Sequence, residues 1–150
     1  MRTNGGAKHG TLSGTPHDWE DEWDKAFSHV WLGVSIENQT VLDLRMASIA
    51  SFPMANLFVS AEPLLEQVDF REWYDVIDWM IVGGESGKGA RMMPMDAVAR
   101  IIDECHERGI PVFFKQWGAR KRDPDKSWGG NLYMGEKVEE WPEDTRKDLT

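Results

Sequence analysis

The fold of this chain is decided by the stretch DWMIVGGESG, residues 78–87. Its apolar run, residues 79–82, shows no alternation, which is typical of a strand covered on both faces in a parallel sheet. The two glycines that follow allow a sharp turn and let a ligand approach backbone N–H groups. Glu85 comes where the strand ends, the usual position of functional side chains in α/β folds. The alternative is an ordinary turn with a solvated glutamate.

Length and charge describe an acidic chain of one domain. It has 150 residues, of which 41% are hydrophobic, and this is enough for a single buried core. The formal net charge is −9, so direct binding of nucleic acid through a basic surface is not expected. The acidity can serve solubility, or it can mimic the charge of nucleic acid; the acids are scattered, which favours the first interpretation.

The only cysteine is Cys105. A lone thiol excludes an internal disulfide and any iron–sulfur or metal site built from cysteines of one chain. No apolar run approaches the roughly 18 residues of a transmembrane helix. Residues 1–16 also lack the apolar centre of a signal peptide. These features predict a cytoplasmic protein without a membrane segment.

The pattern along the chain predicts three regions: a flexible arm over residues 1–17, one α/β domain over 18–142, and a polar tail over 143–150. The domain opens with a predicted amphipathic helix over 18–29, which carries Trp19, Trp23, Ala26 and Phe27 on one face. Such a helix needs an apolar surface to lie on.

Four apolar runs within the domain predict four strands, over residues 30–36, 56–61, 79–82 and 110–114. Helices are predicted over 39–51 and 95–108, a short helix near 70–74, and a β-hairpin over 131–141 around Gly135 and Glu136. In the helix over 95–108, Cys105 lies on the apolar stripe, which favours a buried structural thiol over a reactive one. Strands that alternate with helical links indicate right-handed βα units and a parallel sheet.

Each predicted strand is followed by polar or glycine residues. They are Glu37 and Asn38; Glu62; Gly83, Gly84, Glu85 and Ser86; and Lys115 and Gln116. In a parallel sheet all these carboxyl ends lie on one edge, so we expect a shared functional site there rather than four unrelated solvated positions.

The residue types at this edge suggest several kinds of chemistry. Clustered carboxylates can hold a cation such as Mg²⁺, or one of them can act as a general base. Lys115 can pair with a carboxylate or meet an anionic group of a ligand, and the glycine N–H groups can contact an anion. We predict catalytic roles for Glu62, Glu85 and Lys115. Cofactor-binding roles are predicted for Glu37, Asn38, Gly83, Gly84, Ser86 and Gln116; no metal ligands are assigned.

Four ordered motifs carry a family resemblance: WLGVSIENQ, FVSAEPLL, IDWMIVGGESGKGARMMPMD and GIPVFFKQWG. Together with the end SWGGNLYMGEKVEEWP, they resemble the gene-product-37/gene-product-68 family of phage and prophage proteins over residues 30–142. The resemblance implies a radical-SAM-like barrel, S-adenosylmethionine as a possible cofactor, and the cytoplasm of a bacterial host cell as the location.

The chain departs from that family in its amino-terminal part. It has no Cys cluster to hold an iron–sulfur cluster, and it resembles only the carboxyl-terminal half. The expected fold is therefore a half TIM-barrel-like parallel sheet of about four βα units with a carboxyl-terminal β-hairpin. A half barrel leaves edges and apolar surface exposed, which predicts self-association or a Cys-bearing partner chain.

Three functions remain open from the sequence. The chain can be a remnant or subunit of a radical-SAM-like enzyme. Alternatively, it can be a non-catalytic acidic protein of a phage or mobile element that binds and inhibits a basic host or defence protein. The third alternative is a folded remnant without activity.

Overall fold

The computed structural model of the protein describes residues 27–49, 56–118 and 130–143. The predicted arm, the predicted helix before residue 27 and the tail after residue 143 lie outside the described residues.

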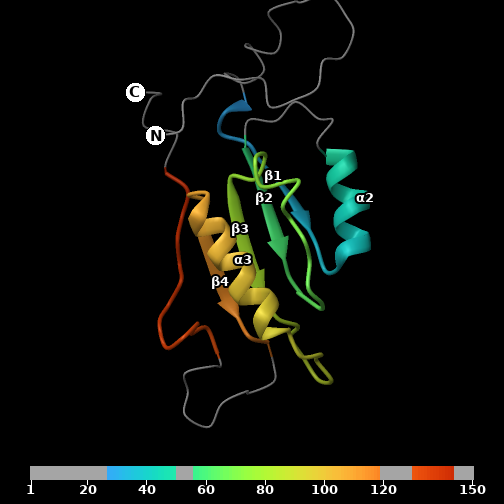
Figure 1. Ribbon diagram of the computed structural model, residues 1–150, viewed down its shortest axis with the longest axis vertical. Coiled ribbons are helices and arrows are strands. Elements are labelled where there is room, and N and C mark those ends of the chain that lie inside the picture. The colour runs from blue at the N-terminus through green and yellow to red at the C-terminus, as the bar shows by residue number, and fades with distance from the viewer. Residues whose placement is uncertain (1–26, 50–55, 119–129, 144–150) are drawn as a thin grey trace, which may run out of the picture.

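Four parallel strands form one open sheet (Figure 1). They are β1 (Trp31–Ser35), β2 (Asn56–Ala61), β3 (Trp79–Gly83) and β4 (Val112–Gln116), and they lie in the order in which they occur in the chain. Each neighbouring pair is parallel. The predicted α/β class and parallel sheet are confirmed, and the sheet does not close into a barrel.

The fourth strand lies two residues later than predicted, so Lys115 and Gln116 belong to the strand and not to the loop after it. Pro111 explains the shift, because a proline has no N–H to donate to the sheet. Its carbonyl still accepts a hydrogen bond from the Met80 N–H at 3.1 Å.

Two helices, α2 (Gln39–Ile49) and α3 (Met95–Glu107), pack against the sheet. Figure 1 shows α3 lying across β3 and β4, with α2 beside β1. The predicted apolar stripe of α3 is confirmed, since Val98, Ile101, Ile102 and Cys105 are all buried. Gly109 ends the helix with φ +66°, and its N–H donates to the His106 carbonyl, the expected role of a glycine after a helix.

The link between β2 and β3 contains turns rather than the predicted short helix. Phe70, Tyr74 and Ile77 nevertheless fill the core beside α3. The Tyr74 hydroxyl donates to Glu104 Oε2 at 3.0 Å, and the Arg108 guanidinium lies 4.7 Å from the Tyr74 ring centre. Of the expected four βα units, only the first and third strands are followed by a described helix.

The two faces of the sheet differ. Alternate residues such as Val34, Val59, Met80 and Phe114 are buried in the core that includes residues of both helices. We call the opposite surface the open face. Its strand residues are Trp31, Gly33, Ser35, Phe58, Ser60, Trp79, Ile81, Gly83, Phe113 and Lys115. No described helix covers it.

Aromatic rings gather on the open face, with Trp79 at their centre. Its ring centre lies 6.4 Å from that of Trp31, 5.9 Å from Phe58, 6.4 Å from Phe113 and 5.0 Å from Trp141. These separations fall within the range of favourable aromatic pairs. The rings therefore hold the four strands and the carboxyl-terminal segment together on the side that lacks helices.

The carboxyl-terminal hairpin is shorter than predicted. Tyr133 and Glu136 exchange two backbone hydrogen bonds, and Met134 and Gly135 between them both have positive φ angles, as two-residue hairpin turns require. The chain then pairs antiparallel with β4, where the Phe114 N–H donates to the Val138 carbonyl at 2.8 Å. This segment covers the outer edge of β4, which would otherwise expose unpaired backbone groups.

Gly84 provides a test of the packing where β3 ends. A Cβ atom at this position would lie 2.3 Å from the backbone oxygen of Trp117, and backbone cannot move aside easily. We expect Gly84→Ala to lower the free energy of unfolding in urea by about 1–3 kcal/mol.

The matched control is Gly33→Ala. Its Cβ would meet the Phe58 ring at 2.2 Å, but that ring lies on the open face and can turn away. The loss should be smaller than for Gly84→Ala; an equal or larger loss would contradict the described packing.

Candidate functional site

The centre of the candidate site is an ion pair that spans β3. Lys115 Nζ, in β4, lies 2.9 Å from Oε1 of Glu62, the residue that follows β2. Gly83 in β3 makes the span possible, because a Cβ there would lie 3.0 Å from Glu62 Cδ. Lys115 is 53% exposed and Glu62 20%, so the pair can be reached from solvent. Such a pair contributes at most about 1 kcal/mol to stability, and a ligand can replace it at little cost.

A second polar pair joins the same edge. Gln116 Nε2 donates to Ser86 Oγ at 2.7 Å. The register of β3 and β4 shifts between Val82 and Gly83, so that Gly83 pairs with Gln116 at this end of the sheet. The Gln116–Ser86 pair links β4 to the loop after β3.

Glu85 is held by the loop that follows it. Its Oε1 lies 2.6 Å from Arg91 Nη2, and its Oε2 accepts hydrogen bonds from Arg91 Nε and from the Arg91 backbone N–H. These hydrogen bonds lower the pKa of Glu85 from 4.5 to about 2. A carboxylate with so low a pKa is a weak base, so this arrangement suits anchoring of residues 85–91 better than proton transfer.

Glu37 and Asn38 both contact residues of the adjacent helix α2. Glu37 Oε1 lies 3.2 Å from Arg45 Nη1 of α2, and the same guanidinium donates to the Ser35 carbonyl. Asn38 Oδ1 accepts the Val41 N–H at 2.9 Å, which makes Asn38 the N-cap of α2. These contacts give both residues a structural role.

The structure therefore brings together part of the predicted site. Glu62, Gly83 and Lys115 meet on the open face, and Ser86 contacts Gln116. Gly84 packs against the Trp117 backbone, while Glu37, Asn38 and Glu85 have partners in their own helix or loop.

Sequence reasoning missed two hydroxyls. Ser35 and Ser60 are paired in register and lie on the same face as Glu62 and Lys115. The period of two along β2 carried this signal, since residues 60 and 62 must point the same way. Together these side chains make a polar end to the open face, while the aromatic rings occupy the other end.

Comparison with known proteins gives one family. The family model described as "Protein of unknown function (DUF5131)" matches residues 7–142. The chain belongs to the DUF5131 family. No curated protein and no solved structure matches this DUF5131 chain.

The thiol of this DUF5131 chain is buried in α3. Burial raises the pKa of Cys105 to about 12, so the thiol stays protonated at neutral pH. Among the described residues, no group of three or more His, Cys, Asp and Glu side chains could hold a metal ion. Within the same residues no helix is both long and apolar enough to cross a membrane.

The Glu85–Arg91 pair predicts a measurable titration. In Arg91→Met the pKa of Glu85 should rise from about 2 toward 4.5, followed by NMR of the side-chain carboxyl carbon. Because folding lowers this pKa, the pair stabilises the protein above pH 4.5, and the contribution is lost as the pH falls through about 2. Arg45→Met should leave Glu85 unchanged; an unchanged Glu85 in Arg91→Met would refute the pairing.

The burial of Cys105 predicts that its thiol is protected from reagents in solution. Native protein should not react with Ellman's reagent at pH 8, because the thiol is both buried and protonated. One equivalent should react after denaturation. Rapid reaction of the native protein would show that α3 does not pack as described.

Proposed function

We propose that this chain is the ligand-binding half of a radical-SAM-like enzyme of phage or prophage origin, a remnant or subunit that acts in the host cytoplasm. The observation that carries the proposal is the exposed Glu62–Lys115 pair across Gly83, at the carboxyl ends of parallel strands. The family resemblance of residues 30–142 suggests S-adenosylmethionine as the ligand.

The charges of the pair match the amino-acid end of that ligand. A zwitterion presents an ammonium group, which a carboxylate such as Glu62 can accept, and a carboxylate, to which Lys115 can donate. A ligand would take the place of the direct contact between Glu62 and Lys115, and Gly83 carries no side chain that would block its approach. Ser35 and Ser60, on the same face, add hydroxyl groups beside the pair.

An iron–sulfur cluster does not fit this chain. The sequence contains one cysteine, and its buried, protonated thiol cannot ligate iron. We therefore assign this chain binding and positioning, and no radical step. The cluster would have to come from a Cys-bearing partner chain. Such a partner, or a second copy, would cover the open face, because residues 138–140 already pair with the outer edge of β4.

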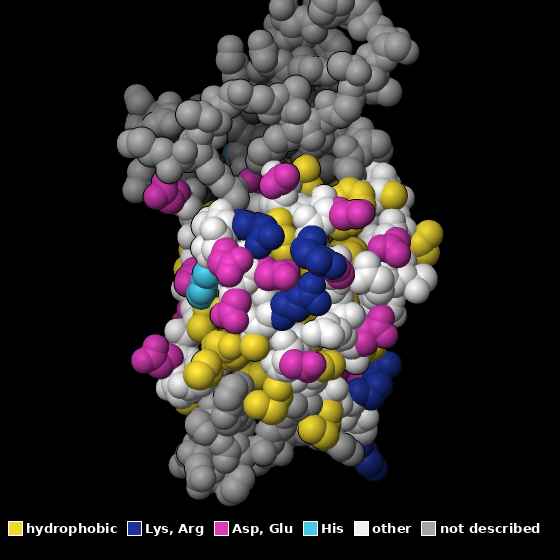
Figure 2. Space-filling view, in the orientation of Figure 1, with side chains coloured by type: hydrophobic (Ala, Val, Ile, Leu, Met, Phe, Trp, Pro, Cys, Tyr) yellow, Lys and Arg dark blue, Asp and Glu magenta, His cyan; other side chains and the backbone are white. Residues whose placement is uncertain are grey.

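The alternative is a non-catalytic protein that binds a basic host or defence protein. The net charge of −9 supports it in a general way. Among the described residues, however, pairs such as Arg100–Glu104 and Arg71–Asp69 neutralise one another. On the side shown in Figure 2, acidic side chains are intermixed with lysines and arginines. This side offers no continuous acidic track of the kind that mimics nucleic acid.

Calorimetry with S-adenosylmethionine tests the proposed function, using the chain alone and the chain with a Cys-bearing partner. Glu62→Gln and Lys115→Met should each weaken binding about tenfold, since each removes one charged contact worth roughly 1.4 kcal/mol. Lys137→Met is the matched control, because it breaks a similar exposed pair with Glu139, 3.1 Å apart and outside the site.

Adenosine lacks the amino-acid end of S-adenosylmethionine. It therefore serves to distinguish binding through Glu62 and Lys115 from binding of the nucleoside part. Any adenosine binding should be the same in wild type, Glu62→Gln and Lys115→Met. No heat with S-adenosylmethionine up to about 1 mM, with or without the partner, would overturn the proposal. Equal affinity of Lys115→Met and Lys137→Met for S-adenosylmethionine would also overturn the proposal.

A further inference from the structure

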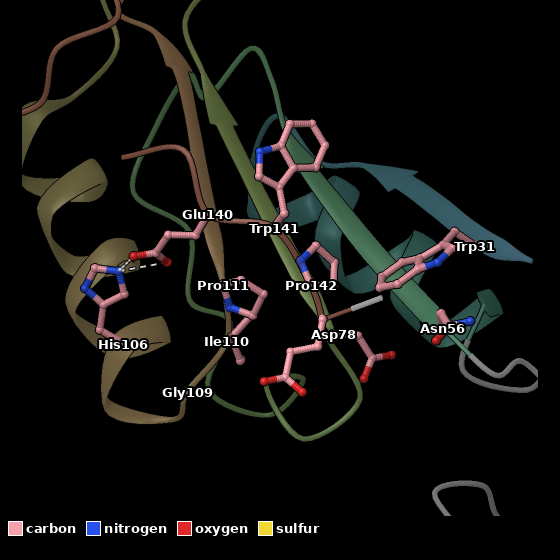
Figure 3. A pocket seen from close by; sticks show the side chains of 11 residues that line it. Trp31, Asn56, Asp78, His106, Gly109, Ile110, Pro111, Glu140, Trp141 and Pro142 are labelled. Carbon is pink, nitrogen blue, oxygen red and sulfur yellow. Dashed lines mark hydrogen bonds and ion pairs between the residues drawn. The ribbon is translucent and has the colours of Figure 1, made fainter. Parts of the chain in front are cut away.

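A hollow lies at the opposite end of the strands from Glu62 and Lys115 (Figure 3). It has a volume of about 660 Å³ and is formed where β1, β2 and β4 begin, with the carboxyl-terminal segment along one side. Its polar and aromatic lining consists of Trp31, Asn56, Asp78, His106, Glu140, Trp141 and Glu143.

Negative charge dominates this hollow. Asp78, Glu140 and Glu143 line it, and none of its described lining residues is a lysine or an arginine. His106 also lines it, and its Nε2 lies 3.1 Å from Glu140 Oε1. A cation that enters the hollow therefore meets several carboxylates.

Two of these carboxylates are fixed by the backbone. Asp78 Oδ2 accepts the Leu57 N–H at 3.0 Å, and Glu140 Oε2 accepts the Val112 N–H at 2.8 Å. Leu57 is the second residue of β2 and Val112 the first of β4. Each hydrogen bond therefore fixes the direction of a carboxylate at the start of a strand. A charge held in place in this way loses little conformational entropy when a ligand binds.

Indole rings form the other part of the lining. Trp141 is 65% exposed, but neighbouring rings hold it in place. The centre of its ring lies 5.0 Å from that of Trp79 and 5.2 Å from that of Phe113. The Trp79 indole N–H also donates to the Glu140 carbonyl at 3.0 Å, which fixes the chain just before Trp141. The structure thus presents a large aromatic surface to solvent beside carboxylates.

We propose that this hollow binds a guanidinium group, the side chain of arginine. A guanidinium is planar and weakly hydrated; it can stack on an indole ring while its N–H fork bonds a carboxylate. An inorganic cation would use the carboxylates but not the rings, and the described residues contain no cluster suited to a metal ion. The site is independent of the Glu62–Lys115 pair and of the proposed function.

NMR titration of the full chain with a blocked arginine, Nα-acetyl-arginine amide, tests the proposal. The matched citrulline compound has nearly the same shape but no charge. We expect the arginine probe to shift the indole N–H signals of Trp31 and Trp141, assigned by single Trp→Phe substitutions. Citrulline should leave them in place.

Conservative variants identify the carboxylates. Asp78→Asn with Glu140→Gln removes two charges but keeps an oxygen for each backbone N–H, and it should raise the Kd of the probe at least about fivefold. Glu139→Gln removes a neighbouring charge that does not line the hollow, and it should bind as wild type. If the double variant does not fold, Trp141→Ala tests the aromatic part of the site at a ring that is 65% exposed.

The result that overturns the proposal is equally specific. Equal shifts with arginine and citrulline, or no shift of either indole, would show that the hollow does not recognise the charge. Unchanged affinity in both the double variant and Trp141→Ala would place any bound guanidinium elsewhere.

Discussion

The parallel pairing of the four strands is the constraint on which the rest of the structure depends. Pairing of Ser35 with Ser60, and of Ser60 with Ile81, fixes which residues share a face. It therefore sends Val59 and Met80 into the core under the helices and leaves Trp79 on the side without them. The same pairing places Glu62 and Lys115 at one end of the sheet, where their side chains meet across Gly83 of β3.

The fold could be predicted because its signals are local. Continuous apolar runs marked the strands, and the stripe of α3 with Gly109 behind it marked the most regular helix. The link over residues 68–77 was harder, because its apolar residues fill the core without helical hydrogen bonds. The pairing of residues 138–140 with β4 could not be anticipated, since it depends on contacts between segments about 25 residues apart in the chain.

The strand pattern indicated which candidate residues lie near one another, but it did not show which contacts they make. Position in the strand was enough to bring Glu62, Gly83 and Lys115 together. Position in a strand could not show that Glu85 forms an ion pair with Arg91, or that Asn38 caps α2. These contacts depend on the direction of side chains within a loop or turn. The hollow at the other end escaped notice because its lining comes from distant parts of the sequence. One sheet thus has a zwitterionic end and an acidic, aromatic end.

The difference between the two faces is tested most directly by hydroxyl-radical footprinting with mass spectrometry. Methionine is highly reactive, so its protection reports packing: Met46, Met80 and Met93 are buried, whereas Met92 and Met134 are 48% and 66% exposed. The account predicts rapid oxidation of Met92, Met134 and the open-face rings, and protection of Met46, Met80, Met93 and Phe114. Oxidation of Met80 and Phe114 at the rate of Trp79 and Phe113 would contradict it, because the helices would then not cover one face alone.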